Sequence, residues 1–358
     1  MTGRPTVDEL VVDLASWMLP GATQPRPPAD DAEATVLVQS AETARLLGPM
    51  LLAVDAGELE LPAEAEDLLV ERHRVNLLWS IHLEARLLEV RDWFARAGGV
   101  QHLVIKGPAV AHLDELDEGL RSFADIDLLV AGPDIDRAVA ALVANGASRP
   151  WAERRPGYDR RFAKSVTLTC SDRVEVDVHR SLCDGVHGFR IPLHRLFASP
   201  DHFDLGGESI AAPAPVHRLL HAAYHAVLGS HTPRLMSLRD IAGYLTRSDI
   251  DLGEVVAEAQ RWRGEAVLAT AVQATMATLR FEAPSWNTWA EGVEVAPADQ
   301  SIIERQRTEG SGLGLGKLDA FRELDGLKDR LAYAKALIWP TRDHLRSRGM
   351  RRSELFTR

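Results

Sequence analysis

Residues 121–130, RSFADIDLLV, decide the fold, because two aspartates there lead into a short apolar run. The run from Ile126 to Val130 has the length and the branched apolar side chains of a buried β-strand. Residues i and i+2 of a strand point to the same face, so the carboxylates of Asp125 and Asp127 can converge on one hard cation. The segment therefore predicts a strand that begins with a pair of possible metal ligands.

A second acidic strand is expected further along the chain, at residues 174–178 (VEVDV). Glu175, Asp177 and the following His179 alternate with valines, which gives the strand one polar and one apolar face. Either this polar face lines a functional site, or the strand belongs to a surface hairpin whose polar face is in water. The preceding run 166–170 (VTLTC) and the short polar turn between the two runs predict an antiparallel hairpin.

A candidate phosphate-binding turn precedes the aspartates. The apolar run 102–106 (HLVIK) leads into Gly107 and Pro108 and then into a helix-like segment. Glycine lets backbone N–H groups approach an anion, proline suits the first position of a helix, and Lys106 adds a cation for a phosphate. A phosphate-binding turn, then two acids, then a third acid is the layout of metal-assisted nucleotidyl transfer.

The whole chain divides into three zones. We predict an α+β fold in which a small mixed sheet is flanked by helical regions at both ends. The boundaries are 1–97 for the N-terminal helical region, 98–212 for the core and 213–358 for the C-terminal helical domain. Helical periodicity occurs at residues 67–95, 133–145, 217–228, 233–246, 252–263 and 265–279.

Composition excludes some classes of protein. The 358 residues include 41 Lys and Arg against 52 Asp and Glu, a net charge of −11, which disfavours a general nucleic-acid-binding protein. No apolar stretch is long enough for a membrane span, and the polar N-terminus does not look like a signal peptide. Two cysteines, Cys170 and Cys183, are too few for a disulfide scaffold. We expect a cytoplasmic protein, and the sequence does not indicate its oligomeric state.

Taken together, three motifs resemble a known family. They are residues 105–113 (IKGPAVAHL), 119–130 (GLRSFADIDLLV) and 174–182 (VEVDVHRSL). In this order they resemble the bacterial uncharacterised nucleotidyltransferase family of the DNA polymerase β-like superfamily. Residues 217–245 resemble its helical segment and residues 338–348 its closing segment, so the resemblance spans about 98–345.

The resemblance implies a polymerase β-like core that transfers a nucleoside monophosphate from a nucleoside triphosphate to an acceptor hydroxyl and releases pyrophosphate. Asp125, Asp127 and Asp177 would be the catalytic acids and would bind two Mg²⁺ or Mn²⁺ ions. The acceptor could be a small molecule, a peptide or a protein.

The same resemblance implies a set of nucleotide-binding residues. Lys106 and Gly107 would hold the triphosphate, Arg121 would contact phosphate or support the aspartates, and His179 would stand at the pocket wall. The chain departs from the superfamily's Gly-Ser turn, because Pro108 follows Gly107 and offers no hydroxyl to a phosphate.

Two other functions fit the same residues. One is a non-catalytic nucleotide-binding or antitoxin-like protein that uses the cleft only for binding. The other is a metal-dependent transferase that takes a glycosyl unit from a nucleotide-sugar and releases a nucleoside diphosphate.

Some polar residues of the helical domain allow more than one interpretation. His217, His221 and His225 would share one helix face and could pack, hydrogen-bond, contact phosphate or bind a metal. Asp240 is expected to pair with one of these histidines or with Arg239.

Three basic or glycine-rich segments are also ambiguous. The basic run 149–164 is either a solvated loop or the flank of a site for an anionic substrate. The basic tail 342–358 is either a solvated end or a contact for an anionic partner. Residues 309–317 (EGSGLGLGK) lack the spacing of a P-loop and read as a linker.

Overall fold

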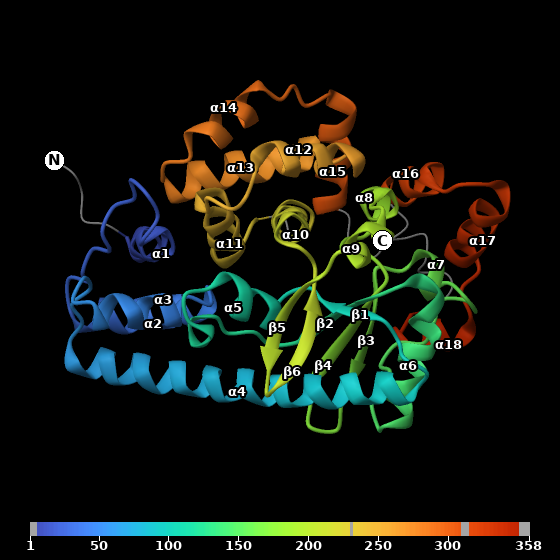
Figure 1. Cartoon of the computed structure of the whole chain (residues 1–358), viewed down its shortest axis with the longest axis horizontal. Coiled ribbons are helices and arrows are strands. Elements are labelled where there is room, and N and C mark those ends of the chain that lie inside the picture. The colour runs from blue at the N-terminus through green and yellow to red at the C-terminus, as the bar shows by residue number, and fades with distance from the viewer. Residues whose placement is uncertain (1–5, 230–231, 309–314, 351–358) are drawn as a thin grey trace.

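The centre of the molecule is a small mixed β-sheet with helices on both faces (Figure 1). The computed structural model describes residues 6–229, 232–308 and 315–350. The strands are β1 His102–Val104, β2 Ile126–Val130, β3 Ser165–Thr169 and β4 Glu175–His179. Their order is β1-β2-β4-β3, with β2 and β4 parallel and the two outer pairs antiparallel. The predicted α+β class, small mixed sheet and β3–β4 hairpin are confirmed.

One face of the sheet is apolar and covered by helices α4 Ala63–Arg96 and α6 Ile135–Ala144. Leu128, Val176 and Val178 are fully buried in the core formed there. α4 runs the length of the molecule beneath the sheet (Figure 1). The helix predicted at residues 67–95 is thus confirmed, and Leu69 and Leu87 of its apolar stripe are buried, whereas Val75, Leu78 and Ile81 are exposed.

The other face of the sheet carries the polar side chains. Asp127 of β2 is the register partner of Asp177 of β4, which in turn is the partner of Thr167 of β3. Two residues further along each strand, Leu129 is the register partner of His179. Because side chains alternate along every strand, these polar residues form one row beneath the C-terminal helices.

The helices from both ends of the chain share a core. Those of the N-terminal region are α1 Val7–Ser16, α2 Asp31–Thr43 and α3 Leu47–Asp55. Those of the C-terminal region include α10 Pro215–Leu228, α11 Leu235–Thr246, α12 Leu252–Arg261, α13 Glu265–Leu279, α14 Pro284–Gly292 and α15 Pro297–Thr308. Leu14 and Met50 belong to the same buried cluster as Leu219 and Val272. The four helices predicted between residues 217 and 279 are confirmed, and the domain boundaries stay predictions.

Short elements complete the fold. They are α5 Pro108–Asp114, the 3-10 turns Glu118–Leu120 and Gly132–Asp134, α7 Asp159–Phe162, α8 Gly185–Arg190, α9 Leu193–Ala198, β5 Asp201–Leu205, β6 Glu208–Ala212, α16 Leu315–Glu323, α17 Leu327–Ile338 and α18 Arg342–Ser347. β5 and β6 form a separate hairpin that the sequence analysis did not predict, although Gly206 and Gly207 between two alternating runs are a hairpin signal.

Two segments that the sequence analysis singled out lie partly outside the residues that the structure describes. Residues 309–314 of the glycine-rich segment and residues 351–358 of the basic tail lie outside the described residues. In the part of the chain that is described, no helix combines the length and the apolar character needed to cross a membrane.

Candidate active site

The parallel pairing of β2 with β4 brings two predicted acids together. Asp127 and Asp177 are register partners, and ligand atoms of Asp127, Asp177 and His179 all lie within 4.8 Å of one another. His179 Nε2 lies 2.6 Å from Asp127 Oδ1 and 3.9 Å from Asp177 Oδ2. His179 is fully buried and Asp127 is 3% exposed, so this pair forms the floor of the site.

Asp125 lies beside this group of three. It precedes β2 and lines the same cavity as Asp127, but among the described residues the close cluster of ligand atoms contains only Asp127, Asp177 and His179. Burial and the charge of Asp127 raise the pKa of Asp125. A cation bound between these carboxylates would relieve that repulsion.

Lys106 neutralises Asp127 directly. Its Nζ lies 3.0 Å from Asp127 Oδ2. Burial alone would raise the pKa of Asp127, but Lys106 and the hydrogen bond with His179 outweigh it, so the pKa is lowered and the carboxylate stays ionised. The segment that follows β1 thus supplies a cation at the point where β2 supplies the acid.

Gly107 holds the chain in a turn that other residues adopt with strain. Its φ is +41°, and an added Cβ would lie 3.1 Å from the ring of Phe123. The following Pro108 is the first residue of α5. The predicted Lys-Gly-Pro turn is therefore present. Gly107 of this turn lies against Phe123, which precedes Asp125 by two positions.

A cavity of about 120 Å³, here called the small cavity, opens over Lys106, Gly107, Asp125 and Asp127. Further charged and imidazole side chains belong to its lining: Arg45, Arg121, Arg218, Arg234, Asp240, His221 and His225. Arg45 comes from the turn between α2 and α3, far away in the sequence, and no local pattern indicates it. The small cavity therefore brings five cationic side chains together with three carboxylates.

Arg121 and Asp240 pair with each other. Arg121 Nη2 lies 2.9 Å from Asp240 Oδ2, and its Nη1 contacts the other carboxylate oxygen. The expected pairing of Asp240 with a histidine or Arg239 is therefore wrong, since Arg239 donates instead to the carbonyls of Ala15 and Trp17. Arg121 comes from the segment before β2 and Asp240 from α11, and only tertiary folding brings them together.

The three histidines of α10 divide into two groups. His217 lies against Glu258, with Nε2 3.4 Å from Oε1, and stacks on Trp262, so it serves packing. His221 Nδ1 donates to the carbonyl of Ile105 at 3.0 Å, which leaves Nε2 as a bare acceptor. Burial lowers the pKa of His221 well below its usual value and that of His225 to about 3, so both rings are neutral.

Thr167 is a site residue that the sequence analysis missed. Its hydroxyl donates to Asp177 Oδ1, which leaves Oδ2 directed toward the other acids. The alternation of Ser165, Thr167 and Thr169 with apolar residues in β3 was the available signal, because it puts hydroxyls on the same face as Asp177.

The donor set is compatible with a hard divalent cation. Carboxylates from Asp127 and Asp177 face each other, and the carboxylate of Asp125 lies on the same cavity. Oxygen donors of this kind suit Mg²⁺ or Mn²⁺. The metal itself stays a proposal.

Comparison with protein families agrees with this chemistry. A family model described as "Uncharacterised nucleotidyltransferase" matches residues 30–279, which is more than half of the chain. The chain belongs to this family. The matched region of the chain includes all four strands of the mixed sheet and the helices α10–α13. Membership of the polymerase β-like superfamily stays a prediction.

Two further comparisons add little. The chain has a TM-score of 0.36 and 14% identity with the crystal structure of an antigenic nucleotidyltransferase-like protein from Paracoccidioides brasiliensis. That similarity covers 60% of this chain and 95% of the other. Among curated proteins, none matches the chain.

Proposed function

We propose that the protein transfers a nucleoside monophosphate from a nucleoside triphosphate to an acceptor hydroxyl and releases pyrophosphate. The observation that carries this proposal is the pairing of Asp127 with Asp177 across parallel strands, beside the ammonium of Lys106. Paired carboxylates next to a cationic cavity suit the binding of a metal–triphosphate complex.

The acids would hold the metal. Asp127 and Asp177, with Asp125 beside them, would bind Mg²⁺ or Mn²⁺. When bound, the metal supplies positive charge to the phosphate oxygens. His179 fixes the orientation of Asp127 through its 2.6 Å hydrogen bond.

Positive side chains of the small cavity would bind the triphosphate. Lys106, Arg45 and Arg234 line it together with the Arg121–Asp240 pair. His221 Nε2 is a buried acceptor without a partner among the described residues, so it can accept a hydrogen bond from a donor group of the substrate. Gly107 keeps the backbone of the turn close to the phosphates.

Asp177 would receive the proton of the acceptor. Thr167 occupies Oδ1, and Oδ2 remains to accept the proton of the attacking hydroxyl. The hydroxyl oxygen then forms a bond to the α-phosphorus while the bond from that phosphorus to the pyrophosphate oxygen breaks. Pyrophosphate leaves with the bonding electron pair.

Calorimetric titration with ATP, GTP, CTP and UTP, with and without Mg²⁺, tests this proposal. We expect Mg²⁺-dependent binding of at least one triphosphate and a loss of about tenfold or more in affinity in Asp127→Asn. Asp136→Asn is the matched control, because Asp136 belongs to another Asp-x-Asp triplet, is exposed and pairs with Arg160. Absence of binding for all four triphosphates would refute the proposal.

A further inference from the structure

A second, larger cavity lies on the β3 side of the sheet. Its volume is about 670 Å³, within the range of small-molecule sites. We call it the basic cavity. Its lining comes from β3, from the loop that precedes it, and from parts of α7, α8, α10, α15, α16 and α18. A cavity lined by this many elements suits a small molecule better than the surface of another protein.

The basic cavity is strongly cationic. Four cations on its wall have no ion-pair partner among the described residues: Arg154, Lys164, Lys317 and Arg348. A fifth cation, Arg149, pairs with Asp159, and the other acid of the lining is Asp184. The basic run 149–164 thus forms part of a cavity wall, and three of its residues supply this charge.

Two of these guanidinium groups are held by aromatic rings. Arg348 lies 4.2 Å from the ring centre of Trp151, and Arg154 lies 5.7 Å from that of Tyr158. Stacking uses the face of a guanidinium and leaves its N–H donors free. Such donors suit the oxygens of a phosphate.

The outer wall of the basic cavity is fixed by hydrogen bonds between distant segments. The Thr341 amide donates to the carbonyl of Arg154 at 2.9 Å, and the amide of Ala152 donates to the hydroxyl of Ser347 at 3.0 Å. His344 Nδ1 lies 2.8 Å from the carbonyl of Ala152. α18 is therefore attached to the loop before α7, and the cavity is built into the folded chain.

The basic cavity approaches Asp177 through Thr167, on the side of Asp177 that faces away from Asp127. In the row across the sheet, Asp177 lies between Asp127, which lines the small cavity, and Thr167, which lines the basic cavity. In phosphoryl transfer the attacking and leaving oxygens are roughly in line on opposite sides of the phosphorus. We expect a donor phosphate over Asp127 and an acceptor in the basic cavity to lie on the two sides of Asp177, which allows such an approach.

We infer that the basic cavity binds the acceptor, and that the acceptor is a small alcohol that carries a phosphate group. This inference rests on the proposed function and names its second substrate. The phosphate binds to the four cations, and the hydroxyl points toward Thr167 and Asp177. Its proton goes to Asp177 Oδ2, its oxygen bonds to the α-phosphorus, and pyrophosphate departs.

Calorimetry with ribose 5-phosphate and inorganic phosphate as probes tests the inference on the full chain. We expect both to bind, neutral ribose not to bind, and Lys164→Gln and Arg348→Gln each to weaken binding of the probes about tenfold. Arg346→Gln on α18 and Lys328→Gln on α17 are matched controls. Both residues are exposed and absent from the cavity lining, so these two variants should bind the probes as the wild type does.

The donor site provides the means to separate the two proposals. Asp127→Asn should weaken Mg²⁺-dependent ATP binding about tenfold or more but leave the binding of ribose 5-phosphate unchanged. If ATP binds and neither phosphate probe does, or if Lys164→Gln and Arg348→Gln bind the probes normally, the acceptor inference is wrong and the proposed function stands. If these two variants weaken ATP as much as ribose 5-phosphate, the basic cavity binds the donor and the inference is again wrong.

Discussion

At the scale of single residues, burial acts to raise the pKa of two neighbouring acids, but charge and hydrogen-bond partners reverse the shift in only one of them. Asp125 and Asp127 are two positions apart, yet the pKa of Asp125 is raised by burial and by the charge of Asp127, while that of Asp127 is lowered. The difference is that Lys106 and His179 both hydrogen-bond to Asp127, whereas Lys106 acts on Asp125 only through its charge. Sequence spacing indicates that both acids share a face, but it does not indicate which carboxylate has hydrogen-bond and charge partners in the folded chain.

Asp159, in the wall of the basic cavity, makes stability depend on pH. Burial raises the pKa of its carboxyl to about 6 from its ordinary 3.8, although Arg149 acts in the opposite direction. A raised folded-state pKa means that the carboxyl's stabilising contribution is complete below pH 3.8 and is lost as the pH rises through 6. Between pH 4 and 8 the free energy of unfolding should fall by about 2–3 kcal/mol from this group.

Asp159→Asn should remove most of that dependence. Urea unfolding at several values between pH 4 and 8 measures it, and Asp343→Asn, at an exposed position of α18, is the control that should behave as the wild type. An unchanged slope in Asp159→Asn would show that another group is responsible.

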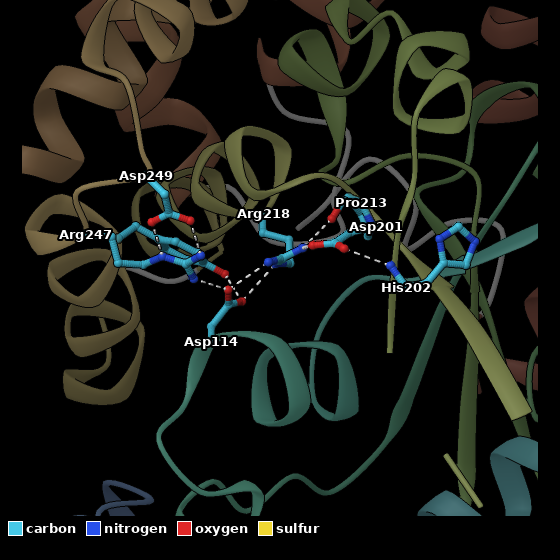
Figure 2. Close-up of polar contacts among 8 residues, drawn as sticks. Asp114, Asp201, His202, Pro213, Arg218, Arg247 and Asp249 are labelled. Atoms are coloured by element: carbon cyan, nitrogen blue, oxygen red, sulfur yellow. Dashed lines mark hydrogen bonds and ion pairs between the residues drawn. The ribbon is translucent and has the colours of Figure 1, made fainter. Parts of the chain in front are cut away.

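At the scale of elements, a buried ion-pair network joins α5 to the C-terminal helices (Figure 2). Asp114 accepts hydrogen bonds from Arg218 Nε and Nη2, both at 2.8 Å, from Arg247 Nη1 at 2.7 Å, and from the hydroxyl of Tyr244. Arg218 also lies 3.0 Å from Asp201 at the start of β5. The network therefore ties α5, which follows the Lys106–Gly107 turn, to α10, α11 and β5.

Asp114→Asn should destabilise the fold by about 3 kcal/mol or more, because the side chain of Arg218 is 2% exposed and loses its main charge partner. Asp249→Asn is the matched control. Asp249 pairs with Arg247 at 2.6 Å in the same region, but its side chain is 59% exposed, so the loss should be about 1 kcal/mol or less. Chemical denaturation of the three proteins measures the difference, and equal losses would contradict the assignment of Asp114 to a buried network.

At the scale of the whole molecule, helices from both ends of the chain depend on each other. α4 covers the apolar face of the sheet, and the buried cluster that contains Leu14 and Met50 also contains Leu219 and Val272. Apolar surface of this extent contributes roughly 25 cal/mol per Å² when it is removed from water. The helical region at 1–97 is thus part of the same cooperative structure as the rest.

A fragment of residues 98–358 should therefore fail to form a native core. We expect it to lack a cooperative thermal transition and to give poorly dispersed amide resonances. Co-expression with residues 1–97 is the control, since it should restore both properties if the missing helices are the reason. A fragment that unfolds cooperatively by itself would instead support the predicted boundary at residue 97.

The sequence by itself determined the local features of this protein. Alternation in 174–178 predicted a strand with a polar and an apolar face, and the short apolar run 126–130 predicted a buried strand. Helical periodicity predicted α4, α6 and α10–α13. These signals depend only on neighbours within a few residues. Only the tertiary structure decided which side chains meet. The parallel pairing of β2 with β4, the partner of Asp240, the separate positions of His217 and His221, and the contribution of Arg45 all depend on contacts between distant segments. Residue spacing carries no information on such contacts, because they are selected by burial and charge compensation in the assembled core.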